Sequence, residues 1–370
     1  MIKWTGLFDP VTFSFKRNMM KTKYIAIALL GLTAASCGSK LAAVRKDALK
    51  PAVVTQALPH DTDDPAIWIH PTDATKSIII GTDKDTDGGL YAFDLNGKII
   101  GKSEVLMRPN NVDIAYGLMI NGKKTDVAVT TERENNKIRI FSLPDLKPID
   151  NGGIPVFEGE LMRDPMGIAL YTRPSDQKIF AVVGRKNGPS GSYLWQYELT
   201  DAGNGNVGAT VVRKFGNYSG KKEIEAIAVD NELGTILYCD EQFGIRKYVA
   251  DPAAKNDNEL ALFGQKDFKA DNEGIAIYKK STTEGYILVS NQQANTFMVY
   301  PREGAIGNPN EYPLLAEIPT STIECDGADV TSVNLGGQFK NGLFVAMSNG
   351  MTFHYYNWDS FQQLIDAATK

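Results

Sequence analysis

Residues with oxygen-bearing side chains recur along the chain, each at the start of a short run of small and β-branched residues. The recurrences are about 50 residues apart, which is near the period of a propeller blade. They begin at Asp64, Asn111, Met166, Glu225, Glu273 and Asp326, with methionine replacing the polar residue in the third. Oxygen ligands without histidine or cysteine favour hard cations, and irregular sets of them suit Ca²⁺ better than Mg²⁺. If the fold brings these segments together, they form a candidate calcium site.

Two further apolar runs follow each of these starting points, and the first of the two ends in polar residues. Short alternating runs predict β-strands, so each starting point opens a unit of three visible strands. The polar pairs are Asp83 with Lys84, Glu132 with Arg133, Arg185 with Lys186, Asp240 with Glu241, Asn291 with Gln292, and Ser348 with Asn349. Fourth strands are expected at residues 99–106, 156–161, 209–215, 259–263 and 314–318.

The sixth unit lacks a fourth strand, because the chain ends in an expected short helix at residues 361–368. A strand at residues 52–58 can pair with this last unit and close the ring, which removes an exposed sheet edge. The sequence therefore predicts an all-β fold, a six-bladed β-propeller closed by an N-terminal strand. We expect residues 49–370 to form this single domain.

In an antiparallel blade, the start of the innermost strand lies beside the end of the second strand. One mouth of the central channel should then collect carboxylates from several blades together with cations, among them Asp63, Asp64, Asp113, Lys84, Arg133 and Arg185. Neighbouring unpaired carboxylates repel one another, and bound metal ions relieve this repulsion. Calcium also reverses the local field, so that an acidic mouth can bind an anion.

Two other interpretations remain open for any single carboxylate. It can be a solvated turn residue, or it can bind calcium that serves rigidity alone. Asp61 and Asp63 lie in the run 60–65, which fits either a capped turn or a metal-binding segment.

The composition excludes several classes of protein. A net charge of -5 argues against nucleic-acid binding through general basicity. The three histidines have no spacing typical of zinc sites. Cys239 and Cys325 are expected to be buried thiols, since two cysteines do not make a disulfide framework.

Residues 1–37 are interpreted as an N-terminal extension and signal peptide. Lys21 and Lys23 precede an apolar run at residues 24–32 that is too short for a membrane span. The order of residues 32–37 resembles a bacterial lipobox, which predicts lipidation of Cys37. Residues 38–48 would be a linker. We expect an exported protein, periplasmic or attached to the outer membrane as a lipoprotein, with membrane contact only through Cys37.

The spaced motifs resemble the β-propeller phytases, also called alkaline phytases, over essentially the whole chain after the signal peptide. The motifs are residues 63–68, 110–113, 271–274 and 290–292, Glu225 with Asp240 and Glu241, and Asp326-Gly327 with residues 342–346. Several motifs in the right order are more specific than any one of them. The resemblance implies a six-bladed propeller, which the strand pattern predicts independently.

The resemblance also implies roles for single residues. Asp64 and Asp326 would belong to calcium sites that hold the ring together. The catalytic calcium ions would be held by Glu225, Glu241, Asp271 and Glu273, and substrate phosphates by Lys84, Arg133, Arg185 and Gln292. With Asp63 and Asp113 from the mouth, these eight carboxylates are the predicted metal ligands.

The implied activity is that of a 3-phytase-type phosphatase, a hydrolase acting on phosphoric monoesters. It would release phosphate from inositol hexakisphosphate (phytate), or from other inositol polyphosphates bound as calcium complexes. Several Ca²⁺ ions would serve, with attack by a metal-activated water. We expect a monomer that binds no nucleic acid.

The third unit departs from the family pattern. Met166 stands where the family usually has tyrosine, and it cannot hydrogen-bond a phosphate. Arg185 can still bind a phosphate bidentately, but Lys186 replaces an expected carboxylate. Two rival functions remain. One is another six-bladed propeller enzyme, a gluconolactonase-type hydrolase using one calcium ion. The other, which Met166 and Lys186 keep open, is a non-catalytic propeller stabilised by calcium that binds a glycan or protein.

Overall fold

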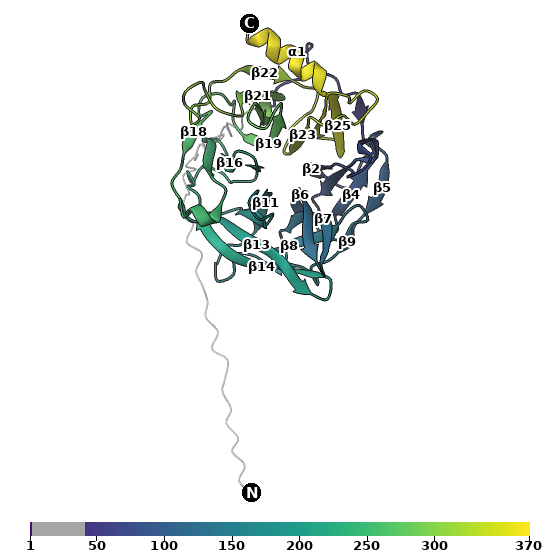
Figure 1. The fold of residues 1–370 in the computed structure, drawn as a ribbon, viewed down its shortest axis with the longest axis vertical. Coiled ribbons are helices and arrows are strands. Elements are labelled where there is room, and N and C mark those ends of the chain that lie inside the picture. The colour runs from purple at the N-terminus through teal and green to yellow at the C-terminus, as the bar shows by residue number, and fades with distance from the viewer. Residues whose placement is uncertain (2–40) are drawn as a thin grey trace, which may run out of the picture. The chain divides into compact units, whose positions relative to one another are not determined.

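The computed structural model describes Met1 and residues 41–370. The predicted signal peptide, Cys37 and the start of the linker lie outside the described residues. Residues 41–370 form six antiparallel sheets arranged in a ring around a central channel (Figure 1). No helix within residues 41–370 is long and apolar enough to cross a membrane.

Each sheet is one blade, and the chain fills the blades in sequence order, from the channel outward. Blade 1 consists of β2 (Thr62–Trp68), β3 (Ile78–Asp83), β4 (Gly89–Phe93) and β5 (Ile99–Lys102). Blade 2 consists of β6 (Pro109–Ile120), β7 (Lys123–Glu132), β8 (Lys137–Ser142), β9 (Lys147–Pro148) and β10 (Ile154–Pro155). Blade 3 consists of β11 (Pro165–Thr172), β12 (Ile179–Arg185), β13 (Leu194–Gly203) and β14 (Asn206–Phe215).

Blades 4 to 6 complete the ring. Blade 4 consists of β15 (Ile227–Asp230), β16 (Thr235–Asp240), β17 (Gly244–Val249) and β18 (Ala261–Phe263). Blade 5 consists of β19 (Asn272–Lys279), β20 (Gly285–Asn291), β21 (Thr296–Pro301) and β22 (Ala316–Pro319). Blade 6 contains β23 (Ala328–Thr331), β24 (Leu343–Ser348) and β25 (Thr352–Asn357). The predicted six-bladed propeller is confirmed. Each predicted fourth strand overlaps an observed strand except that of blade 2, where β10 ends just before the predicted range 156–161.

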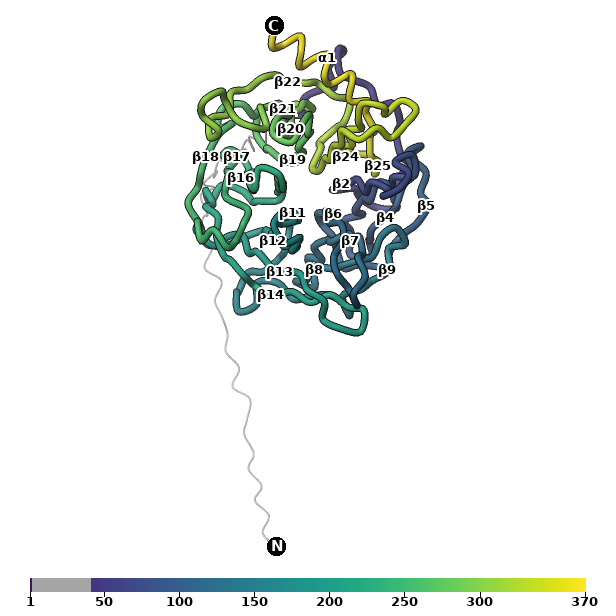
Figure 2. The backbone as a smooth tube through the Cα atoms, in the orientation of Figure 1, coloured from purple at the N-terminus to yellow at the C-terminus, as the bar shows by residue number. Residues whose placement is uncertain are grey.

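The N-terminal strand β1 (Val53–Val54) closes the ring, as predicted. It is the outer strand of blade 6, where Val53 pairs with Tyr355 and Val54 with His354 of β25. Figure 2 shows the backbone running round the ring until the C-terminal strands lie beside the N-terminal ones. The sheet edge that blade 6 would otherwise expose is therefore paired.

The helix α1 (Trp358–Ala368) begins earlier than the predicted range 361–368. Asn357 caps it, because its side chain accepts a hydrogen bond from the backbone N–H of Asp359. Its buried residues Trp358 and Phe361 pack into the core of blades 5 and 6.

The core lies between blades rather than within one layer. Neighbouring sheets pack face to face, so that both faces of the middle strands are covered; one such cluster joins Val129 and Ile140 of blade 2 to Ala181 and Trp195 of blade 3. All six residues of β3 are buried for this reason, including the apolar run Ile78 to Ile80 at its start.

Four of the six innermost strands have an irregularity in pairing at their first residues. It lies between Thr62 and Pro65 in β2, and the same interruption occurs in β6, β11 and β19. A β-bulge of this kind adds a residue to one strand, increases the local twist and redirects a side chain. A residue in such a bulge can therefore turn its side chain toward the mouth of the channel, as Asp63 and Asn110 do.

Candidate metal and phosphate site

Lys84 follows β3 at the mouth and joins blade 1 to blade 6. Its Nζ donates to Oδ1 of Asp63 at 2.8 Å and to Oδ2 of Asp326 at 2.5 Å. Burial lowers the pKa of Lys84, but the two carboxylates more than offset this and raise it above its ordinary value. Gly327 permits the contact between the blades, because a Cβ there would lie 2.3 Å from Asp64 Oδ1.

Asn110, in the bulge of β6, connects blades on opposite sides of the channel. Its Nδ2 donates to Asp63 Oδ2 at 2.8 Å and to Glu225 Oε1 at 2.5 Å. Glu225 lies just before β15, so a single amide links blades 1, 2 and 4. Burial raises the pKa of Glu225 well above its ordinary value, and the nearby charge of Asp63 raises it further.

The other half of the mouth is built by blades 4 and 5. Lys222 Nζ lies 2.7 Å from Glu241 Oε2, 2.9 Å from Asp271 Oδ2 and 3.0 Å from Glu273 Oε1. Glu241 is fully buried, and the Lys222 ammonium is the cation that lies beside its carboxylate. Burial raises the pKa of Glu241 to about 7, although Lys222 acts in the opposite direction.

Gln292 completes the ring of polar contacts. It follows β20, and its Nε2 donates to Glu273 Oε2 and to Asp326 Oδ1, each at 2.6 Å. Together with Lys84, Asn110 and Lys222 it connects the carboxylates of blades 1, 4, 5 and 6 into one network. The convergence expected at the mouth is present for these blades.

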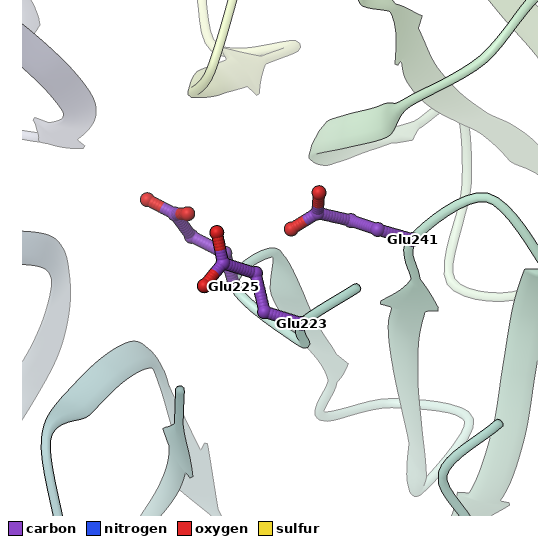
Figure 3. Close-up of side chains that lie close together, drawn as sticks. All are labelled: Glu223, Glu225 and Glu241. Atoms are coloured by element: carbon purple, nitrogen blue, oxygen red, sulfur yellow. The ribbon is translucent and has the colours of Figure 1, made fainter. Parts of the chain in front are cut away.

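Two overlapping groups of three carboxylates could hold a cation within residues 41–370. The first contains Glu223, Glu225 and Glu241, and Figure 3 shows their side chains extending into the same space. The second contains Glu241, Asp271 and Glu273. In each group, one oxygen per residue lies within 4.8 Å of the others.

These residues fit a hard metal ion such as calcium. All the donors are carboxylate oxygens, the type that Ca²⁺ prefers. A second indication is Glu241, because a fully buried carboxylate needs a compensating cation, and in this structure the Lys222 ammonium takes that place at 2.7 Å. Glu241 belongs to both groups, so it is the residue on which the two candidate positions depend.

Asp64 and Asp113 do not join this network. Asp64 Oδ2 accepts a hydrogen bond from the backbone N–H of Val112 at 3.1 Å, and Asp113 Oδ2 accepts one from Leu170 at 2.6 Å. Both line the central channel, whose cavity has a volume of about 340 Å³. Their contacts join each blade to the next, and their predicted role as metal ligands stays a prediction.

The two predicted phosphate-binding arginines differ in environment. Arg133 is half-buried at the mouth, with its Nη1 3.5 Å from Asn110 Oδ1. Arg185 is 1% exposed, lies over the Phe157 ring, and donates to the backbone oxygens of Met162 and Ser192. Phosphate could reach Arg133 in this structure, whereas Arg185 would first have to leave its packing.

The third blade differs from the others in having Met166 and Lys186 at positions where an oxygen-bearing side chain is expected. Met166 is buried, and its backbone oxygen accepts a hydrogen bond from Thr131. Lys186, which replaces an expected carboxylate, lies with its Nζ 3.3 Å from Glu223 Oε2. The lysine is therefore an ion-pair partner for one of the candidate metal groups.

Sequence reasoning missed three residues of this site as site residues: Asn110, Lys222 and Glu223. Asn110 lies within the motif of residues 110–113, and its position in the bulge of β6 is the signal that could have indicated its role. Lys222 and Glu223 lie in the irregular segment between β14 and β15, where no strand alternation shows which way a side chain points.

The fold and site together define a class, a six-bladed propeller with carboxylate groups at one mouth that could hold a metal ion. Residues 18–355 match the phytase family, and the chain belongs to it. It is therefore a hydrolase of phosphoric monoesters. Among curated proteins it is similar to a 3-phytase of Bacillus subtilis (strain 168), with 30% identity over 322 residues, 81% of this chain and 80% of that protein.

Among solved structures, the chain is similar to a luciferin-regenerating enzyme with a TM-score of 0.51. The sequence identity is 13%, and the match covers 82% of this chain and 95% of that one. At this identity the similarity concerns the fold alone, and it agrees with the propeller described above.

Proposed function

We propose that this phytase releases phosphate from inositol hexakisphosphate in a calcium-dependent reaction at the mouth described above. The observation that carries the proposal is the fully buried Glu241 carboxylate, which is shared by both candidate metal groups of a chain that belongs to the phytase family.

Calcium would be held by Glu225, Glu241, Asp271 and Glu273, with Glu223 as a further ligand. When bound, the ion acidifies water and offsets negative charge on the phosphoryl oxygens. The ion would also change the field of the mouth from one that repels a polyanion to one that attracts it.

The protein's own cations would orient the substrate. Lys84 and Arg133 are connected through Asp63 and Asn110, so their charged groups lie on neighbouring blades at one side of the mouth. A ring carrying several phosphates can place one near each cation while another lies over the carboxylates. Arg133 can bind a phosphate through two N–H groups, which fixes orientation as well as position.

A direct test measures phosphate release from phytate by the full chain with calcium and after thorough chelation. We expect release only with calcium. Glu225→Gln and Glu273→Gln should abolish it, and Glu198→Gln should not, because Glu198 pairs with Lys178 on the side of blade 3 away from the mouth carboxylates. Release that survives chelation, or no release at any calcium concentration, would contradict the proposal.

The same preparation tests the two rival functions. A gluconolactonase-type hydrolase would open a simple lactone and leave phytate intact. A non-catalytic binding propeller would act on neither compound but would still be stabilised by calcium.

We also propose that the protein is exported and lipidated at Cys37, on the basis of the charged, apolar and small-residue order of residues 21–37. Expression with labelled palmitate in a bacterium should label the chain, and Cys37→Ser should remove the label. A soluble, unlabelled chain with residues 1–37 removed would support export without the anchor.

A further inference from the structure

A lysine ammonium occupies the centre of the second carboxylate group. Lys222 Nζ lies between 2.7 and 3.0 Å from one oxygen each of Glu241, Asp271 and Glu273. Those three residues also offer oxygens within 4.8 Å of one another. The ammonium therefore fills the space that a cation shared by the three carboxylates would need.

A metal ion and this ammonium exclude each other. Calcium binds oxygens at about 2.3 to 2.6 Å, which is closer than the contacts of Lys222, and it carries twice the charge. Binding of calcium by all three oxygens leaves no room for the ammonium among them. The charges also repel, because both groups are positive.

The side chain can leave without disturbing the fold. It is 33% exposed, and it is carried by the irregular segment between β14 and β15. A lysine has a flexible four-carbon stem, so the ammonium can move into solvent while the backbone stays in place.

We propose that Lys222 is a tethered cation that a metal ion must displace, so that it sets the metal concentration at which Glu241, Asp271 and Glu273 fill. The proposal rests on the calcium dependence proposed above. In the metal-free protein, Lys222 holds the three carboxylates together. On metal binding it is released toward the mouth.

Calcium binding to the chelated full chain, measured by titration calorimetry, tests this directly. Lys222→Met removes the competing charge with a side chain of similar length. We expect its dissociation constant for calcium to fall by roughly 10- to 100-fold, the range of a lost hydrogen bond to a charged group. Lys221→Met is the matched control, because Lys221 Nζ donates to the backbone oxygen of Gln242 rather than to a carboxylate.

The outcomes separate this inference from the proposed function. Tighter calcium binding by Lys222→Met, with Lys221→Met unchanged, supports the competition. Binding that is equal to or weaker than that of the natural chain overturns it, even if the enzyme is calcium-dependent. If neither chain binds calcium, the calcium dependence itself fails.

A second measurement needs no variant and so does not depend on how a variant folds. Amine labelling followed by mass spectrometry should show that calcium increases the labelling rate of Lys222 several-fold, while Lys221 is unchanged. An unchanged or reduced rate at Lys222 would show that the ammonium stays among the carboxylates when calcium binds.

Discussion

The carboxylates of the mouth and those of the channel below it are the same chemical groups in neighbouring positions, yet their partners differ. Asp63 accepts hydrogen bonds from the side chains of Lys84 and Asn110. The next residue, Asp64, accepts one from the backbone of the adjacent blade, and Asp329 does the same with Ile67. Side-chain partners can move aside for a ligand, whereas backbone partners belong to the blades themselves.

This difference indicates that the buried carboxylates of the propeller have two functions, one at the mouth and one in the channel. Mouth carboxylates are held by the side chains of lysine, asparagine and glutamine, as Lys222 holds Glu241 and Gln292 holds Glu273. Channel carboxylates satisfy backbone N–H groups where inner strands approach one another. Mutations in the first region should therefore affect activity, and mutations in the second should affect stability.

The largest effect is expected at Glu225. In Glu225→Gln the amide removes a negative charge from a candidate metal group, and we expect the rate of phosphate release to fall at least about 100-fold. Asp329→Asn, in the channel, is the matched control and should keep most of the activity, because Asp329 accepts its hydrogen bond from the backbone of Ile67. Similar losses in the two variants would remove the distinction between the regions.

The second largest effect is expected in the pH dependence of the free energy of unfolding, to which the channel carboxylate Asp329 contributes. Burial raises the pKa of Asp329 to about 6. Because its folded pKa exceeds the unfolded value, the folded state binds more protons, and stability falls as pH rises from about 4 to about 6, by about 2 to 3 kcal/mol. Urea unfolding of chelated protein should show that Asp329→Asn has a smaller loss across this window. If the free energy of unfolding of Asp329→Asn falls with pH as steeply as that of the natural chain, Asp329 is not the group responsible.

A smaller loss is expected when a connection between blades is removed. Asp113→Ala leaves the N–H of Leu170 without its acceptor, so the free energy of unfolding should fall by about 1 to 3 kcal/mol. Asp113→Asn keeps an acceptor and should lose less. If Asp113→Asn instead loses part of the stabilisation by calcium, the metal role predicted from sequence gains support.

The smallest effect is expected on the KM for phytate, when Arg133 and Arg185 are replaced in turn. Arg133→Met should raise the KM for phytate by about tenfold, because one charge-assisted contact to phosphate is lost. Arg185→Met should lower the melting temperature, since Arg185 packs against Phe157, with less effect on KM. A larger rise in KM for Arg185→Met would show that its side chain reaches the substrate after all.

Much of the fold follows from the sequence because blades repeat. The innermost strands, the closing strand near residue 53 and the terminal helix all have local signals. The convergence of Glu225, Glu241, Glu273 and Asp326 followed from the position of each residue at or near the end of its strand. These inferences needed only the alternation of strands and the antiparallel order.

Side-chain direction was harder to predict. Asp63 and Asp64 both lie in the bulge of β2, where regular alternation is interrupted and does not show which of the two faces the mouth. Arg185 ends its strand at the expected edge, but its packing against Phe157 depends on a loop with no regular pattern. Lys222 comes from a similar loop, and its place among three carboxylates is a tertiary contact.

The bulges at the starts of β2, β6, β11 and β19 separate two kinds of change in this protein. Regular pairing resumes after each bulge, so a substitution within it alters the mouth without shifting the strand behind it. The blades can therefore keep their packing over evolutionary time while the chemistry of the mouth varies residue by residue. Met166, in the bulge of β11, stands at such a position.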